Sequence, residues 1–164
     1  MASSALRRFF VYGTLKRGEP NHHVLTRPEN GVSKFVGCAE TTVKLPLVIG
    51  TRYNIPFLLN KRGTGHFVRG EVYEVDDAMM EKLDELEGYP EFYDREIQDM
   101  KILDDGEGKL LPCWVYLIRN YPEHLLNFEM LTEYKDTPEK RYCESYNEST
   151  PEDLREGIQT DLKK

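Results

Sequence analysis

The sequence predicts an α+β fold, a small mixed β-barrel or curved sheet with one main internal helix. Several short runs rich in β-branched and aromatic residues alternate with turns that contain glycine, a pattern typical of a sheet with hairpins. Before residue 134, one segment alone combines a helix cap, strong helix formers and a glycine stop. The 164 residues suit one domain, because compact domains usually hold about 100–200 residues.

The expected strands and turns can be followed along the chain. The first strand, residues 9–12, is a short apolar run that ends at Gly13. An extended region follows over residues 34–49, in which Pro46 marks an edge, a bulge or a bend. Next, "YNIPFLL" and "HFVRGEVYEV" flank "NKRGTG", whose paired glycines predict a hairpin turn. A second hairpin is predicted where "REIQDMKIL" and "LLPCWVYLI" flank "DDGEGK".

The main helix is predicted directly after the run "HFVRGEVYEV". Asp76 is a suitable N-cap, and Asp77 places a negative charge near the positive end of the helix dipole. The "AMMEKLDELE" segment consists of good helix formers, and Gly88 suits the position just beyond a helix end. Pro90 follows two residues later, so the helix is expected to end before Gly88.

The last part of the chain is charged and poor in apolar residues. The segment "STPEDLREGIQTDL" begins like a capped helix, with Thr150 before Pro151, but its apolar face is thin. We therefore expect residues 1–142 to form the folded domain. Residues 143–164 are expected to be a charged C-terminal extension, marginally helical or disordered.

Composition argues against several classes of partner. A formal net charge of −7 does not suit nucleic acid or an anionic membrane, because both require a basic face. No apolar run approaches the roughly 18 residues that span a bilayer, and no secretory signal is recognisable at the N-terminus. Three widely spaced cysteines without a CxxC pair are typical of reduced thiols. We expect a cytoplasmic monomer whose partner is a small molecule.

The sequence shows no pattern of a common cofactor or metal site. "GTGHFVRG" lacks both the spacing and the helix of a dinucleotide site, and no phosphate-binding P-loop pattern occurs. The four histidines have no metal-ligand spacing, and no serine or cysteine stands in a recognisable nucleophile context. We therefore expect an activity that needs neither cofactor nor metal.

Helix geometry singles out Glu87 as a candidate catalytic residue. At about 100° per residue, Glu87 lies in the arc formed by the methionines and leucines of this helix. The other acids, Glu81, Asp84 and Glu85, fall on the opposite side. The helix dipole, the charge of Asp84 and partial burial all raise the pKa of Glu87, as suits a general base. The alternative is a frayed helix end, with Glu87 solvated or paired with an arginine such as Arg95.

The stretch "VYGTL" allows two interpretations. A strand that ends at Gly13 leaves consecutive backbone N–H groups that no ladder needs, and glycine lets a ligand approach the main chain. Such N–H groups can hold a carboxylate or a developing oxyanion. Strand-Gly-Thr junctions are common and most are plain turns, so this stretch by itself is a weak signal for a binding site.

Together these segments resemble the γ-glutamylcyclotransferase superfamily. "VYGTLKRGEPNH" is similar to the family's substrate loop, and "LDELEGYP" is similar to the segment that bears its catalytic glutamate. "PLVIG", "YNIPFLL" and "GEVYEVD" also recur in order, so the resemblance is specific and covers residues 9–142. Carried over by position, the resemblance implies that the substrate site is lined by Tyr12, Gly13, Thr14 and Leu15. It implies that Glu87 is the catalytic acid/base.

The resemblance also implies a fold and a reaction. It implies a small mixed barrel that cleaves γ-glutamylamines, such as ε-(γ-glutamyl)lysine, into 5-oxoproline and the free amine. The substrate's α-amine attacks its own γ-carbonyl, so no protein nucleophile or cofactor is needed. One alternative is a cyclotransferase that acts on γ-glutamyl amino acids or glutathione. Another is a non-catalytic γ-glutamyl-binding module, in which position 87 would be expected to lack a carboxylate.

Overall fold

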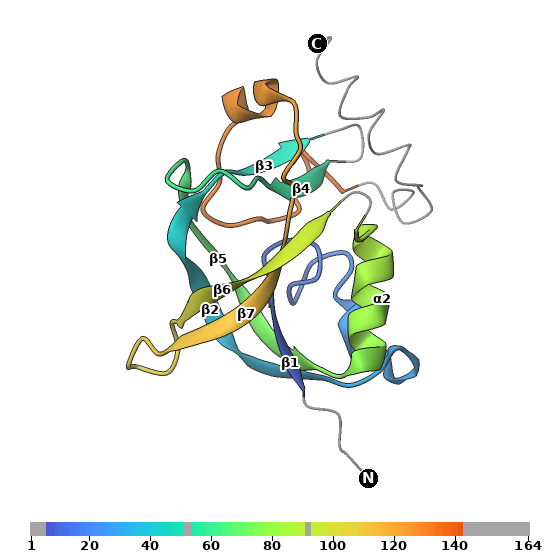
Figure 1. Cartoon of the computed structure of the whole chain (residues 1–164). Coiled ribbons are helices and arrows are strands. Elements are labelled where there is room, and N and C mark those ends of the chain that lie inside the picture. The colour runs from blue at the N-terminus through green and yellow to red at the C-terminus, as the bar shows by residue number, and fades with distance from the viewer. Residues whose placement is uncertain (1–5, 51–53, 91–92, 143–164) are drawn as a thin grey trace.

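A computed structural model describes residues 6–50, 54–90 and 93–142. Five strands form a closed barrel in the order β1-β5-β2-β6-β7 (Figure 1). Adjacent strands are antiparallel except β1 and β7, which close the barrel in parallel through Phe9 and Trp114. This mixed barrel confirms the predicted fold class. The strands are β1 (Arg7–Val11), β2 (Ser33–Leu45), β5 (His66–Val75), β6 (Asp94–Ile102) and β7 (Leu110–Leu117).

The first strand is apolar along most of its length because both of its faces are buried. Phe10 lies in the cluster of side chains that fills the barrel, together with Val72 and Val115. Phe9 belongs to the second cluster, which contains buried side chains of α2 (Asp77–Glu87) such as Leu83. The helix lies alongside the barrel (Figure 1), so β1 connects the two halves of the core.

One of the two predicted hairpins is correct and the other is wrong. Strands β6 and β7 pair in antiparallel fashion across "DDGEGK", as predicted. In contrast, β4 (Ile55–Leu58) does not pair with β5 but with β3 (Leu47–Gly50) in a separate two-stranded sheet. The sequence after "NKRGTG" pairs with the end of β2, where Leu45 lies opposite His66. Strands β3 and β4 are therefore an excursion from a longer β2–β5 pairing, and the excursion begins at Pro46.

Helix α2 begins and ends where its capping residues predict. The Asp76 carboxylate accepts a hydrogen bond from the Met79 N–H at 2.9 Å. Gly88 adopts a left-handed conformation with φ 68°, and its N–H bonds the carbonyl of Glu85. These caps fix the end of the helix, and they determine where the last helical residue, Glu87, lies relative to the barrel.

Short helical turns complete the described chain: α1 (His23–Thr26), η1 (Pro28–Asn30) and η2 (Glu123–Asn127). Across residues 6–50, 54–90 and 93–142, no helix has the length and apolar character that crossing a membrane requires. The predicted extension, residues 143–164, lies outside the described residues, so its helical or disordered character stays a prediction. The monomeric state and cytoplasmic location stay predictions as well.

Candidate active site

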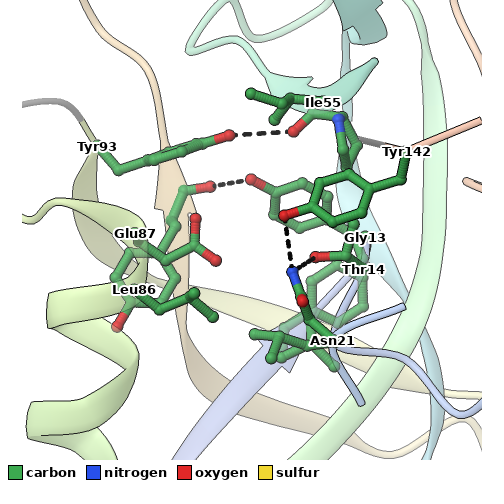
Figure 2. Close-up of a pocket in the computed structure, with 14 residues that line it drawn as sticks. Gly13, Thr14, Asn21, Ile55, Leu86, Glu87, Tyr93 and Tyr142 are labelled. Atoms are coloured by element: carbon green, nitrogen blue, oxygen red, sulfur yellow. Dashed lines mark hydrogen bonds between the residues drawn. The ribbon is translucent and has the colours of Figure 1, made fainter. Parts of the chain in front are cut away.

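A pocket opens where the end of β1, the end of α2 and strand β4 meet (Figure 2). It has about 470 Å³ of space between its walls, including the open mouth. The structure brings all five predicted site residues to this one pocket. They are joined by several aromatic and apolar side chains; the lining consists of Phe10, Val11, Tyr12, Gly13, Thr14, Leu15, Asn21, Ile55, Pro56, Leu86, Glu87, Tyr93, Tyr116 and Tyr142.

The loop after β1 folds back on itself through main-chain hydrogen bonds. The Lys16 N–H bonds the Gly13 carbonyl at 3.2 Å, and the Asn21 N–H bonds the Thr14 carbonyl at 2.8 Å. The N–H groups of Gly13, Thr14 and Leu15 donate to no acceptor within residues 6–50, 54–90 and 93–142. Three consecutive N–H groups at a pocket wall can bind an anionic oxygen.

Packing against a neighbouring strand also explains why position 13 is a glycine, which the sequence did not reveal. A Cβ atom built on Gly13 would approach the Pro56 Cγ to 2.7 Å, which is too short for a carbon–carbon contact. Pro56 belongs to β4, which the excursion after Pro46 brings against the loop. The glycine therefore lets the loop pack directly on β4, and this close packing positions the neighbouring N–H groups.

Asn21 and Tyr142 hold the loop from the inside, and sequence reasoning identified neither. The Asn21 side-chain amide donates to the Thr14 hydroxyl and to the Tyr142 hydroxyl, each at 3.0 Å (Figure 2). Asn21 is 1% exposed and Tyr142 is also buried. A clue for Asn21 was available, because it lies within the quoted "YGTLKRGEPNH" stretch. Tyr142 had no clue, because it comes from the far end of the described chain.

Two charged residues of the same loop, neither of which lines the pocket, anchor the loop to the rest of the fold. The Lys16 ammonium is buried and donates to the Tyr134 carbonyl at 2.6 Å. The Arg17 N–H donates to the buried Glu71 carboxylate at 2.9 Å. These bonds satisfy the buried charges and hold the loop rigid on its outer side.

Glu87 is the last residue of α2, and its carboxyl points into the pocket, toward the side where Thr14 and Asn21 lie (Figure 2). It forms no ion pair or hydrogen bond with the part of the chain that the structure describes. Burial, and secondarily the negative charge of Asp84, raises the pKa of Glu87 to about 8. The carboxyl can therefore exchange a proton near neutral pH.

The prediction that Glu81, Asp84 and Glu85 lie on the polar side of α2 is correct for Glu81 and Glu85 and wrong for Asp84. Glu81 and Glu85 are exposed, but Asp84 is half-buried and forms a bidentate ion pair with Arg95 at 2.9 and 3.2 Å. The reason is that Arg95 on β6 and Tyr116 on β7 contact the last turn of the helix on a second side. The alternative in which Arg95 pairs with Glu87 is therefore wrong as well.

Two tyrosines fix the wall between the loop and β7. The Tyr12 hydroxyl donates to the Tyr116 carbonyl at 2.8 Å, and the Tyr116 hydroxyl donates to Asp84 at 2.7 Å. Burial raises the pKa of Tyr12 and of Tyr116 well above the ordinary value for tyrosine, so both hydroxyls stay protonated. Nowhere in the described residues do three or more histidine, cysteine or acidic side chains gather as metal ligands.

The fold and the sequence together identify the family of this chain. The family described as "Gamma-glutamyl cyclotransferase, AIG2-like" matches residues 9–136, and the chain belongs to this family.

Individual relatives share most of the chain. "Putative gamma-glutamylcyclotransferase CG2811" of Drosophila melanogaster is 56% identical over 84% of this chain and 85% of its own length. "Gamma-glutamylaminecyclotransferase C" of Danio rerio is 47% identical over 72% of this chain and 79% of its own length. The crystal structure of an AIG2-like protein from Mus musculus has a TM-score of 0.80 and 38% identity, and the match covers 84% of this chain and 95% of that chain.

Proposed function

We propose that the protein is a γ-glutamylaminecyclotransferase, which converts γ-glutamylamines such as ε-(γ-glutamyl)lysine into 5-oxoproline and the free amine. One observation carries this proposal. Glu87, an acid with a raised pKa and no partner within the described residues, shares a pocket with unpaired N–H groups of the loop after β1. Family membership supports it, and the Danio rerio relative bears the name of this activity.

The reaction is an intramolecular acyl transfer. Glu87 accepts a proton from the substrate's α-ammonium, and the freed amine attacks the γ-carbonyl carbon to close a five-membered ring. The resulting oxyanion is stabilised by N–H groups of Gly13, Thr14 and Leu15. When the bond between the γ-carbon and the leaving nitrogen breaks, Glu87 gives this proton to the leaving nitrogen. The ring nitrogen still carries a second proton, which Glu87 removes and passes to the departing amine, so that 5-oxoproline keeps one N–H and the amine leaves as an ammonium. Protons balance over the cycle, so one carboxyl suffices.

The same pocket favours leaving amines without a carboxylate beside the scissile bond. Glu87 is the one formally charged side chain among the described lining residues, and none of those residues is Lys, Arg or His. A γ-glutamyl amino acid places a carboxylate one carbon from the leaving nitrogen, close to Glu87, whereas glutathione carries the carboxylate of its leaving group one residue further away, on the glycine. Like charges at that distance repel, and no cation of the described lining offsets the cost. In ε-(γ-glutamyl)lysine the leaving nitrogen is the lysine Nε, so the whole lysine side chain separates it from the lysine carboxylate.

A cyclotransferase acting on γ-glutamyl amino acids is the second candidate, since the Drosophila melanogaster relative carries that name. The purified protein should be incubated with ε-(γ-glutamyl)lysine, γ-glutamylalanine and glutathione, and 5-oxoproline should be quantified. We expect kcat/KM to be highest for ε-(γ-glutamyl)lysine. A preference for γ-glutamylalanine or glutathione would favour the second candidate. Binding without 5-oxoproline from any of the three would indicate a non-catalytic module.

The raised pKa of Glu87 predicts the pH dependence of the reaction. Because the ionised carboxylate is the base, kcat/KM should rise with pH and level off above about 8, the pKa of Glu87 in the empty pocket. The ammonium of a bound substrate stabilises the carboxylate, so the acidic limb of kcat should lie at lower pH. Initial rates between about pH 5.5 and 9.5 test both limbs. A kcat/KM that is flat below about pH 8 would contradict the role of Glu87 as base.

The position of Tyr142 predicts where the chain can be shortened. A chain that ends at Tyr142 retains every described pocket residue, so its kcat should stay within about twofold of the full chain. A chain that ends at Thr132 loses Tyr142 and the Tyr134 carbonyl that anchors Lys16. It should lose both thermal stability and activity. Loss of activity in the longer of the two chains would show that residues 143–164 contribute to the site.

A further inference from the structure

Asp84 and Glu87 lie one turn apart at the end of α2, and Asp84 forms an ion pair with the nearby Arg95. Arg95, on β6, donates to both carboxylate oxygens of Asp84, through Nε at 2.9 Å and Nη2 at 3.2 Å. The Tyr116 hydroxyl donates to the same carboxylate at 2.7 Å. Asp84 thus accepts three hydrogen bonds, whereas Glu87 accepts none from the described residues.

Arg95 is held rigidly in this position. Its guanidinium carbon lies 4.2 Å from the centroid of the Tyr89 ring and 4.4 Å from the centroid of the Trp114 ring. Its side chain is 13% exposed, and that of Asp84 is 20% exposed. A guanidinium stacked between two rings and bonded in bidentate fashion cannot readily turn toward Glu87.

Among the described residues, the other polar side chains that line the pocket of Glu87 are uncharged. Four tyrosines line its pocket from other elements: Tyr12 after β1, Tyr93 before β6, Tyr116 on β7 and Tyr142 near the end of the described chain. Burial raises the pKa of Tyr12 and Tyr116, so neither carries charge near neutral pH. In the described structure, the charges packed between this end of α2 and the barrel are those of Asp84 and Arg95.

We propose that Asp84 and Arg95 are positioning residues that together set how tightly Glu87 holds its proton. Asp84, one turn away, favours the protonated carboxyl through its negative charge, and Arg95 limits that effect by neutralising Asp84. By engaging Arg95, Asp84 also prevents a direct ion pair between Arg95 and Glu87, which would fix Glu87 as a permanent carboxylate. The effect on the Glu87 pKa does not depend on the proposed function, whereas its consequence for catalysis does.

The test compares variants that break the same ion pair from opposite sides. Asp84→Asn keeps the shape and removes the negative charge, so the Glu87 pKa should fall by about one unit. Arg95→Gln removes the positive charge and leaves Asp84 uncompensated, so the Glu87 pKa should rise by about half a unit. A purely structural pair would give shifts of the same sign or none. The pKa is measured by carbon-13 NMR of the carboxyl group, identified by its loss in Glu87→Gln.

Further variants separate charge from geometry and from catalysis. Arg95→Lys keeps the charge without the planar fork, so its Glu87 pKa should stay close to wild type; a rise equal to that of Arg95→Gln would overturn the proposal. If Asp84→Asn does not fold, the comparison of Arg95→Gln with Arg95→Lys decides. The NMR titration needs no substrate, so it tests the proposal even if no γ-glutamylamine is cleaved. If the protein is active, the acidic limb of kcat/KM should shift in the same directions.

Discussion

Replacing Glu87 by glutamine is expected to lower kcat for ε-(γ-glutamyl)lysine by at least about a hundredfold, the usual contribution of a positioned general base. Glutamine keeps the size of the side chain and can still hydrogen-bond the substrate, but it cannot accept a proton from the α-ammonium. The same group also returns the proton to the leaving amine, so both halves of the reaction are affected. Substrate binding should persist, because the N–H groups of Gly13, Thr14 and Leu15 remain.

The matched control is Glu85→Gln, two residues away on the same helix. Glu85 is exposed and lines no part of the described pocket, so its variant should keep kcat within about twofold of wild type. Steady-state rates and the substrate Kd of both variants should be measured in parallel. More than about a tenth of wild-type kcat in Glu87→Gln, or a larger loss in Glu85→Gln, would mean that the catalytic residue lies elsewhere.

The sequence was sufficient for those features that depend on neighbouring residues. Asp76 and Gly88 act at fixed distances from the helix that they cap, so both ends of α2 could be predicted from local chemistry. The direction of Glu87 followed from helical phase, because the last turn remains helical up to Gly88. The β6–β7 hairpin was predictable for the same reason, since its strands are separated by one short turn.

Features that depend on distant strands were not predictable in this way. Helical phase divides a helix into one apolar and one polar side, but β6 and β7 also cover the side that carries Asp84. Pairing of β4 with β3 rather than β5 depends on the long β2–β5 ladder, which local turn signals do not report. Tyr142 reaches the pocket from the far end of the domain, so its role needed the tertiary structure.

The second large effect is expected in stability rather than rate: the stability of the wild-type protein should decrease between about pH 4.5 and pH 8 because of Glu87. In the folded protein the pKa of Glu87 is about 8, whereas that of a glutamate in the unfolded chain is about 4.3. Between these values the unfolded state binds fewer protons, so the free energy of unfolding falls as pH rises. The contribution is complete below about pH 4.3 and is lost by about pH 8.

Glu87→Gln removes this titration, so the variant should become progressively more stable than wild type as the pH increases. Each pKa unit corresponds to about 1.4 kcal/mol, and because Glu87 retains some exposed surface we expect a difference of about 2–3 kcal/mol at pH 8.5. Urea denaturation of both proteins at several pH values measures it. Glu85→Gln, at an exposed position, should follow the wild-type curve throughout. Parallel curves for wild type and Glu87→Gln would show that the Glu87 carboxyl titrates normally, and a general base active near neutral pH would then have to be sought at another residue.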